Sequence, residues 1–141
     1  MREHMGLYRG KRIDNGEWVE GYYVRLFDGK GNVSHRIYNG YAETDCGEFY
    51  PDWFEVDPDT VGECAMMTDK NDDLIFEGDI CDHHVQGNIL INRGVVNWDA
   101  KHSRWAFQLN TMNPDFYMHN PAAWEIIGNI HDNPELLKSE G

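Results

Sequence analysis

The chain has 141 residues, of which 40% are hydrophobic and 13% aromatic, so it can bury a core and is not a disordered chain. It has three cysteines without a CxxC pair, no apolar run long enough to cross a membrane and no signal peptide pattern, which argues against a disulfide framework and predicts a cytoplasmic protein. The net charge of −13 and the lack of a dense basic cluster argue against direct binding to nucleic acid.

Turn dipeptides separate short runs rich in Val, Ile, Tyr, Trp and Phe, a pattern that predicts a mainly β fold. In the first part of the chain we expect an antiparallel meander of three strands, at residues 7–12, 18–27 and 33–38. Asn39-Gly40 is expected to end the third strand. Residues 41–58 contain two prolines and are expected to form a long connection with short strands.

The second part of the chain continues the strand pattern. Further strands are expected at residues 61–67, 74–85 with a bend at Gly78-Asp79, 95–98 and 104–109. Strict alternation in the last of these predicts that Trp105, Phe107 and Leu109 face the core. Asn133-Pro134 predicts a capped, short helical turn near the C-terminus.

Acidic residues concentrate in residues 43–82, which we call the acidic window. It holds fourteen acids against one base, Lys70, and so accounts for the whole net charge, because the eleven acids and eleven bases outside it cancel. Dense carboxylates can imitate DNA phosphates and block a host nucleic-acid-binding protein. They also give a solvated, soluble surface, which is the commoner role.

Residues 69–73 resemble the start of a calcium loop, because oxygen ligands stand at its first, third and fifth positions. The rest of the loop does not fit. Leu74 stands where a glycine is needed for the sharp turn, and Ile80 stands where a bidentate glutamate is needed. We therefore expect a turn that carries solvated carboxylates.

Other candidate sites are weaker. Cys81 and His83 can share one strand face and, with Cys64, could hold a transition metal, but no second matched pair exists. Glu77 and Asp79 lie two residues apart and could form an acid/base pair. The remaining pieces of a hydrolase or nuclease site are isolated histidines: His84, His119 and His131. We expect Cys46, Cys64 and Cys81 to be structural thiols, and we assign no catalytic, cofactor-binding or metal-binding residue.

Five segments in the right order resemble the YopX proteins of bacteriophages and prophages. They are LYRGKRIDNGEWVEGYYV (7–24), VDPDTVG (56–62), TDKNDDLIFEGDI (68–80), RGVVNWD (93–99) and EIIGNIHDNPELL (125–137). Together they span most of the chain. The resemblance implies phage or prophage origin, self-association and no assigned activity, and it transfers no site residues.

The resemblance also implies one family unit over residues 1–141. Its N-terminal β subdomain would be residues 1–60, and residues 61–141 would form a partly open, SH3-like small barrel. The chain departs from the family pattern where ECAMM, residues 63–67, replaces QYTGL, and where Asn71-Asp72 replaces Asn-Gly. Without that glycine, a turn with positive backbone angles costs more.

Three functions are compatible with the sequence. The first is a non-enzymatic accessory protein that binds protein, itself included, since five tryptophans can supply interface anchors as well as core. The second is the acidic DNA mimic. The third, and least supported, is a metal-dependent hydrolase that uses carboxylates with His83, His84 or His131.

Overall fold

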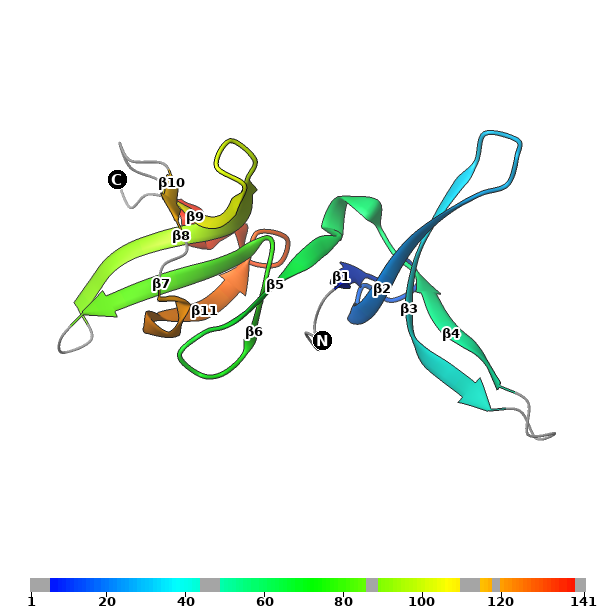
Figure 1. Ribbon diagram of the computed structural model, residues 1–141, viewed down its shortest axis with the longest axis horizontal. Coiled ribbons are helices and arrows are strands. Elements are labelled where there is room, and N and C mark those ends of the chain that lie inside the picture. Colours follow the sequence, from blue (N-terminus) through cyan, green and yellow to red (C-terminus); the bar gives the residue numbers. More distant parts are fainter. Residues whose placement is uncertain (1–5, 44–48, 86–88, 110–114, 118–119, 139–141) are drawn as a thin grey trace. The chain divides into compact units, whose positions relative to one another are not determined.

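The computed structural model describes residues 6–43, 49–85, 89–109, 115–117 and 120–138 and shows a mainly β protein, as predicted (Figure 1). The strands are β1 (Leu7–Lys11), β2 (Trp18–Phe27), β3 (Val33–Glu43), β4 (Phe49–Glu55), β5 (Gly62–Thr68), β6 (Leu74–Phe76), β7 (Asp79–Val85), β8 (Ile89–Asp99), β9 (Arg104–Leu109), β10 (Asp115–Tyr117) and β11 (Trp124–Asn129). Single 3-10 turns form η1 (Pro58–Thr60), η2 (Pro121–Ala123) and η3 (Pro134–Leu137). Within the described ranges, no helix has the length and apolar character needed to cross a bilayer.

The chain divides into two compact units, Met1–Cys64 and Ala65–Gly141, whereas the sequence placed the boundary after residue 60. Strand β5 begins in the first unit, where it pairs with β1, and continues into the second. Both units are built from antiparallel strands. The SH3-like closure of the second half stays a prediction.

Strands β4, β3, β2 and β1 of the first unit belong to a six-stranded sheet with the order β4-β3-β2-β1-β5-β6. Strand β3 pairs with β2 through residues 33–38 and with β4 through residues 36–43, so two long hairpins share this strand. One face of the sheet carries the core, made by Val19, Ile37 and Val56. Because β-strand side chains alternate, the neighbouring residues of each strand lie on the opposite face.

The second unit contains a sheet with the order β10-β9-β8-β7-β11. Its core is larger and includes Ile75, Cys81, Val96, Phe107 and Trp124, all at most 1% exposed. The predicted core positions Phe107 and Leu109 are confirmed, since both are buried. The third predicted position, Trp105, is partly buried and packs against the same cluster.

Two glycines lie inside strands, one at a bulge and one at a close approach, although Asn39-Gly40 was expected to end the third strand. Gly40, at a φ of 152°, lies where the β3–β4 register shifts, and β3 continues through it to Glu43. Gly94 lies inside β8, where a Cβ would come within 2.9 Å of the Phe107 Cβ. Glycine avoids backbone strain at the bulge and a steric clash at the close approach.

Four further features differ from the prediction. The expected bend at Gly78 is a full turn with a φ of 92°, so the stretch 74–85 forms two strands, β6 and β7. Residues 49–55 form one full strand, and its Pro51 is tolerated because β4 is the edge of the sheet. Strands β10 and β11 were not predicted, although β11 supplies the buried Trp124.

The C-terminal turn was predicted correctly, but its cap works differently. Residues Pro134–Leu137 form η3 after Asn133, as expected. The Asn133 side chain makes no capping bond within η3. Its Oδ1 instead accepts the backbone N–H of Asn129 at 3.2 Å, and Gly128 leaves room for it. Asn133 therefore closes the end of β11.

Candidate functional site

The first unit exposes an aromatic sheet face opposite its core. Residues Tyr22, Tyr38 and Trp53 lie side by side on β2, β3 and β4, because Tyr22 pairs with Tyr38 and Tyr38 with Trp53. Tyr22 is 61% exposed and Trp53 is 41% exposed. We call this surface the open face and define it by Tyr22, Val24, Arg36, Tyr38, Trp53 and Glu55.

Arg36 lies at the centre of the open face and is held from several sides. Its Nε donates to Ser34 Oγ at 3.1 Å, and its Nη1 donates to Tyr38 Oη at 3.4 Å. Its guanidinium carbon lies 3.7 Å from the centre of the Trp53 ring. Residues 34, 36 and 38 share one face of β3 because side chains on a strand alternate. The guanidinium is therefore fixed against an aromatic wall.

A hollow lies beside the open face at the end of β4. It has a volume of about 250 Å³ and is lined by Ile13, Asp14, Trp53, Phe54 and Glu55. Ile13 is 60% exposed, and its backbone N–H donates to the Glu55 carbonyl at 3.0 Å. The hollow thus joins an apolar rim to the edge of the open face.

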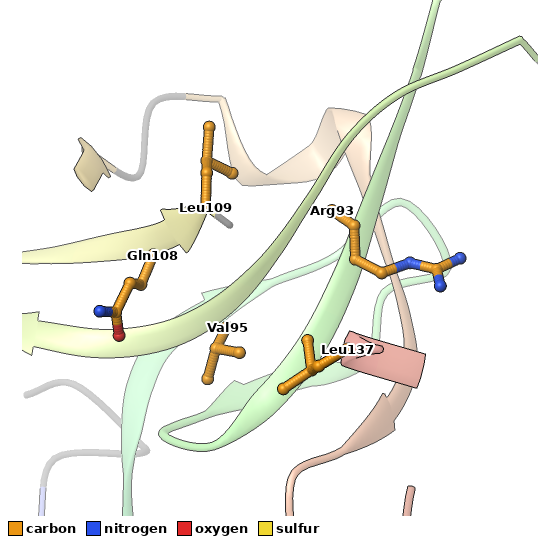
Figure 2. Close-up of a pocket in the computed structure, with 5 residues that line it drawn as sticks. All are labelled: Arg93, Val95, Gln108, Leu109 and Leu137. Atoms are coloured by element: carbon orange, nitrogen blue, oxygen red, sulfur yellow. The ribbon is translucent and has the colours of Figure 1, made fainter. Parts of the chain in front are cut away.

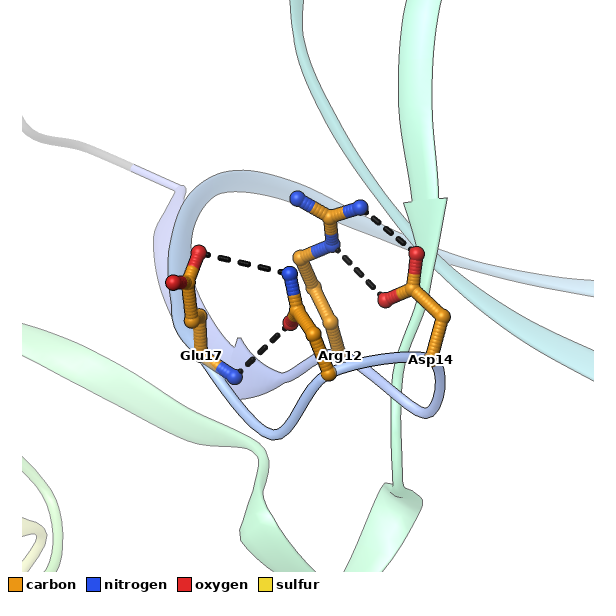
Figure 3. Close-up of polar contacts among 4 residues, drawn as sticks. Arg12, Asp14 and Glu17 are labelled. Atoms are coloured by element: carbon orange, nitrogen blue, oxygen red, sulfur yellow. Dashed lines mark hydrogen bonds and ion pairs between the residues drawn. The ribbon is translucent and has the colours of Figure 1, made fainter.

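An ion pair braces the turn that borders this hollow (Figure 3). Arg12 donates to both oxygens of Asp14, from Nε at 3.0 Å and from Nη2 at 2.6 Å, and its guanidinium lies 4.1 Å from the centre of the Phe54 ring. The hydrogen bond between them is the main cause that lowers the pKa of Asp14 and raises the pKa of Arg12. On the same turn, Asn15 bonds both the side chain and the backbone N–H of Glu17. Asp14 is thereby neutralised by its neighbour.

Cations gather on this side of the sheet in an otherwise acidic chain. On β1, next to the open face, Arg9 and Lys11 lie 4.7 and 5.5 Å from the centre of the Trp18 ring. Together with Arg36 they face two acids on the same side of the sheet, Glu20 and Glu55. The local balance is therefore positive, whereas the whole chain carries −13.

The calcium-like segment is a structural turn, as predicted, but its first carboxylate is not solvated. Asp69 is 3% exposed, and its Oδ1 accepts the backbone N–H groups of Asn71 and Asp73 at 2.9 and 3.0 Å. Its Oδ2 accepts the N–H of Ile126 at 2.9 Å. Asp69 therefore ties the turn to β11.

Two more acids of the acidic window are buried and serve the fold. Asp79, 2% exposed, accepts the Phe76 N–H at 2.8 Å and closes the turn before β7. Asp82, 5% exposed, receives two bonds from Arg93, at 2.6 and 2.9 Å. These acids are not on the surface, and the other described acids of the window are divided between the two units.

A second hollow, of about 240 Å³, lies in the second unit between β8, β9 and η3 (Figure 2). It is lined by Arg93, Val95, Gln108, Leu109 and Leu137. Besides its two bonds to Asp82, Arg93 donates to the Leu136 carbonyl at 2.9 Å. Its charge is thus neutralised, and it holds η3 on the sheet.

The predicted cysteine and histidine sites take part in packing. Cys64 and Cys81 are buried, one in each unit. His83 stacks on Trp124 with ring centres 4.9 Å apart, and Trp124 stacks on Phe107 at 3.9 Å. Within the described residues, no group of three or more His, Cys, Asp or Glu is placed to hold a metal ion. The side chain of His84, and all of Cys46 and His119, lie outside the described residues.

Sequence reasoning did not single out Arg36 or Trp53. The alternating Ser34, Arg36 and Tyr38 could have indicated that one face of this strand is polar and aromatic, but Trp53 lay in the stretch interpreted as a connection. Only the pairing of β3 with β4 brings Trp53 beside Tyr38, with ring centres 6.4 Å apart.

The model of the YopX protein family matches residues 7–138, nearly the whole chain. Among curated proteins, none gives a significant match. The crystal structure of protein EF1440 from Enterococcus faecalis is similar in fold, with a TM-score of 0.57 and 21% sequence identity over 93% of this chain and 96% of that chain. This chain belongs to the YopX family.

Proposed function

We propose that this protein is a non-enzymatic phage or prophage accessory protein that works in the cytoplasm of the host bacterium by binding protein, a second copy included, through the open face. The observation that carries the proposal is the exposed pair of rings, Tyr22 and Trp53, with the half-buried Arg36 packed against Trp53. Tyrosine, arginine and tryptophan are the residue types most enriched among those that dominate binding energy at protein interfaces.

The chemistry of a sheet face supports this function. When an antiparallel sheet packs its core on one face, the other face normally carries polar side chains in water. Here that second face carries Tyr22 and Trp53, whose rings are large and apolar. Covering them would remove apolar area from water at about 25 cal/mol per Å². A partner that buries this face gains that free energy.

The test is affinity capture with the tagged full-length protein from host lysate, followed by mass spectrometry. Trp53→Ala is compared with Trp98→Ala, a matched control in the second unit whose side chain is 47% exposed. A partner captured by the wild type and by Trp98→Ala, but lost with Trp53→Ala, supports the proposal. Circular dichroism and thermal unfolding confirm that both variants fold.

Two results would contradict the proposal. One is capture that is equally strong with both variants, which places the interface elsewhere. The other is a strict monomer in light scattering from which no partner is recovered.

A further inference from the structure

We infer that the open face receives a carboxylate side chain of its protein partner, bound by Arg36 beside the Trp53 ring. The inference rests on the proposed function, because it names the chemistry of the partner at that same surface. It assigns the partner segment an aspartate or glutamate next to an apolar residue.

Arg36 is prepared for such a ligand before binding. Ser34 and Tyr38 each accept one of its N–H groups, and Trp53 covers one side of its plane. A guanidinium has five N–H donors, so three remain for a ligand. A guanidinium whose N–H donors are already positioned loses less conformational entropy when a carboxylate binds.

Among the residues that the structure describes, no carboxylate already neutralises that charge. Arg36 makes no ion pair with any residue that the structure describes. Glu55 stands directly across from it on β4, is exposed, and still makes no ion pair with it. The contrast with Arg12 and Arg93 is clear, since each of these is bonded to an aspartate through two nitrogens.

The surroundings favour a protein carboxylate over a phosphate backbone. Binding along a nucleic acid relies on many cations that displace counterions, and this chain carries a net charge of −13. One guanidinium is enough for one carboxylate, which it can bind through two parallel hydrogen bonds. The exposed rings of Tyr22 and Trp53 supply the apolar contact that makes such a bond stronger by excluding water.

The neighbouring hollow accounts for the apolar residue. Its apolar lining is Ile13, Trp53 and Phe54, and Trp53 also lies against Arg36. Its two acids are Asp14, which is paired with Arg12, and Glu55. If a side chain of the partner fills this hollow, the next residue along an extended partner peptide lies close to the Arg36 guanidinium. The partner segment is therefore expected to pair an aliphatic or aromatic residue with an acid.

The experiment pans a displayed library of random dodecapeptides against the wild-type protein and four variants. Arg36→Gln removes the charge, and Arg36→Lys keeps the charge but not the paired N–H donors of the guanidinium. Trp53→Ala tests the surface itself. The matched control, Arg25→Gln, lies on β2 beside His35 and faces the other side of the sheet. Thermal unfolding verifies that each variant is folded.

We expect wild-type binders to be enriched in Asp or Glu next to an apolar residue, and Arg25→Gln to select the same peptides. Arg36→Gln should weaken the best peptide about 10- to 100-fold, the loss typical of a charge-assisted hydrogen bond. Replacing the peptide's Glu by Gln, or its Asp by Asn, should weaken wild-type binding similarly and leave Arg36→Gln binding unchanged, which identifies the pair directly.

The outcomes separate the two claims. Peptides that depend on Trp53 but show no acidic preference and no response to Arg36→Gln would overturn this inference and leave the proposed function standing. If no peptide depends on Trp53, both fail. Binding of a single-stranded dT oligonucleotide that requires both Arg36 and Trp53 would also overturn it, because the anion would then be a phosphate.

Discussion

The two units use their charged side chains in opposite ways. In the second unit, Asp69, Asp79 and Asp82 are buried and bonded, so they hold turns and strands together. In the first unit, the aspartates with lowered pKa, Asp14 and Asp28, lie exposed on turns. The family-typical segment at residues 68–80 thus builds the fold, whereas the candidate binding surface lies in the other unit.

The buried cores of the two units also differ. The buried cluster of the second unit includes Phe107 and Trp124, which stack on each other. Among the described residues of the first unit, the buried cluster consists of Val19, Ile37 and Val56. Most large aromatic rings of the first unit are therefore left at the surface or half-buried, where they can serve an interface.

The largest effect should come from removing the carboxylate that joins the segment to β11. Asp69→Ala leaves three backbone N–H groups without their acceptor and should lower the free energy of unfolding by about 3–5 kcal/mol. Urea denaturation measures it. The nearby exposed Asp73→Ala should change stability by less than about 0.5 kcal/mol. Equal losses would mean that Asp69 is not a structural centre.

A substitution at Gly21 tests whether the first unit depends on close strand contact. A Cβ there would clash with the Tyr38 carbonyl oxygen and lie 2.9 Å from Ile37 Cγ2. Gly21→Ala should therefore cost about 2–3 kcal/mol and reduce peptide binding, because β2 and β3 must move apart. Calorimetry and binding are compared with Glu20→Ala, an exposed neighbour. An unchanged melting temperature would show that the strands are looser than described.

A smaller effect, this time a gain in stability, is expected at the turn that lacks the family's glycine. Asp72 has a φ of 67°, a left-handed angle that glycine adopts at little cost. Asp72→Gly should stabilise the protein by about 0.5–1 kcal/mol in urea denaturation. Asp73→Gly, which places a glycine where no positive φ is needed, should lower stability. Destabilisation by Asp72→Gly would contradict the turn geometry.

The smallest effect is expected in the stability of the protein at low pH. The pKa of Asp28 is lowered, first by the side-chain bond from Asn32 and then by the Lys30 N–H. Its contribution to stability is present above the unfolded value of about 3.9 and is lost as the pH falls through the lowered folded value. Between pH 7 and about pH 2, the melting temperature of Asp28→Ala should therefore fall less than that of the wild type. An equal loss would show that this turn does not contribute.

Local patterns were enough to predict much of the fold. A strand-rich run between turn residues located β2 at its observed bounds, and alternation located β9 and identified Phe107 and Leu109 as core. Glycine was ambiguous, because the same residue type marks a turn at Gly16 and a bulge at Gly40. Only the neighbouring strand decides between the two.

The candidate surface was out of reach of sequence reasoning for a related reason. Arg36 and Trp53 lie 17 positions apart, and the sequence does not show that β3 and β4 pair with Tyr38 opposite Trp53. Composition showed many tryptophans but could not separate the buried Trp124 from the exposed Trp53. The burial of Asp69 was missed likewise, since its partner Ile126 lies on a strand that was not predicted.

If the first unit binds through its open face, one spectrum of the tryptophan side chains will show it. The chain has five tryptophans, so a ¹H–¹⁵N spectrum resolves five indole N–H signals, which single Trp→Phe variants assign. On addition of the selected peptide, the account predicts that the Trp53 signal shifts while the Trp98 signal stays in place. A shift of Trp98 with Trp53 unmoved would contradict the account.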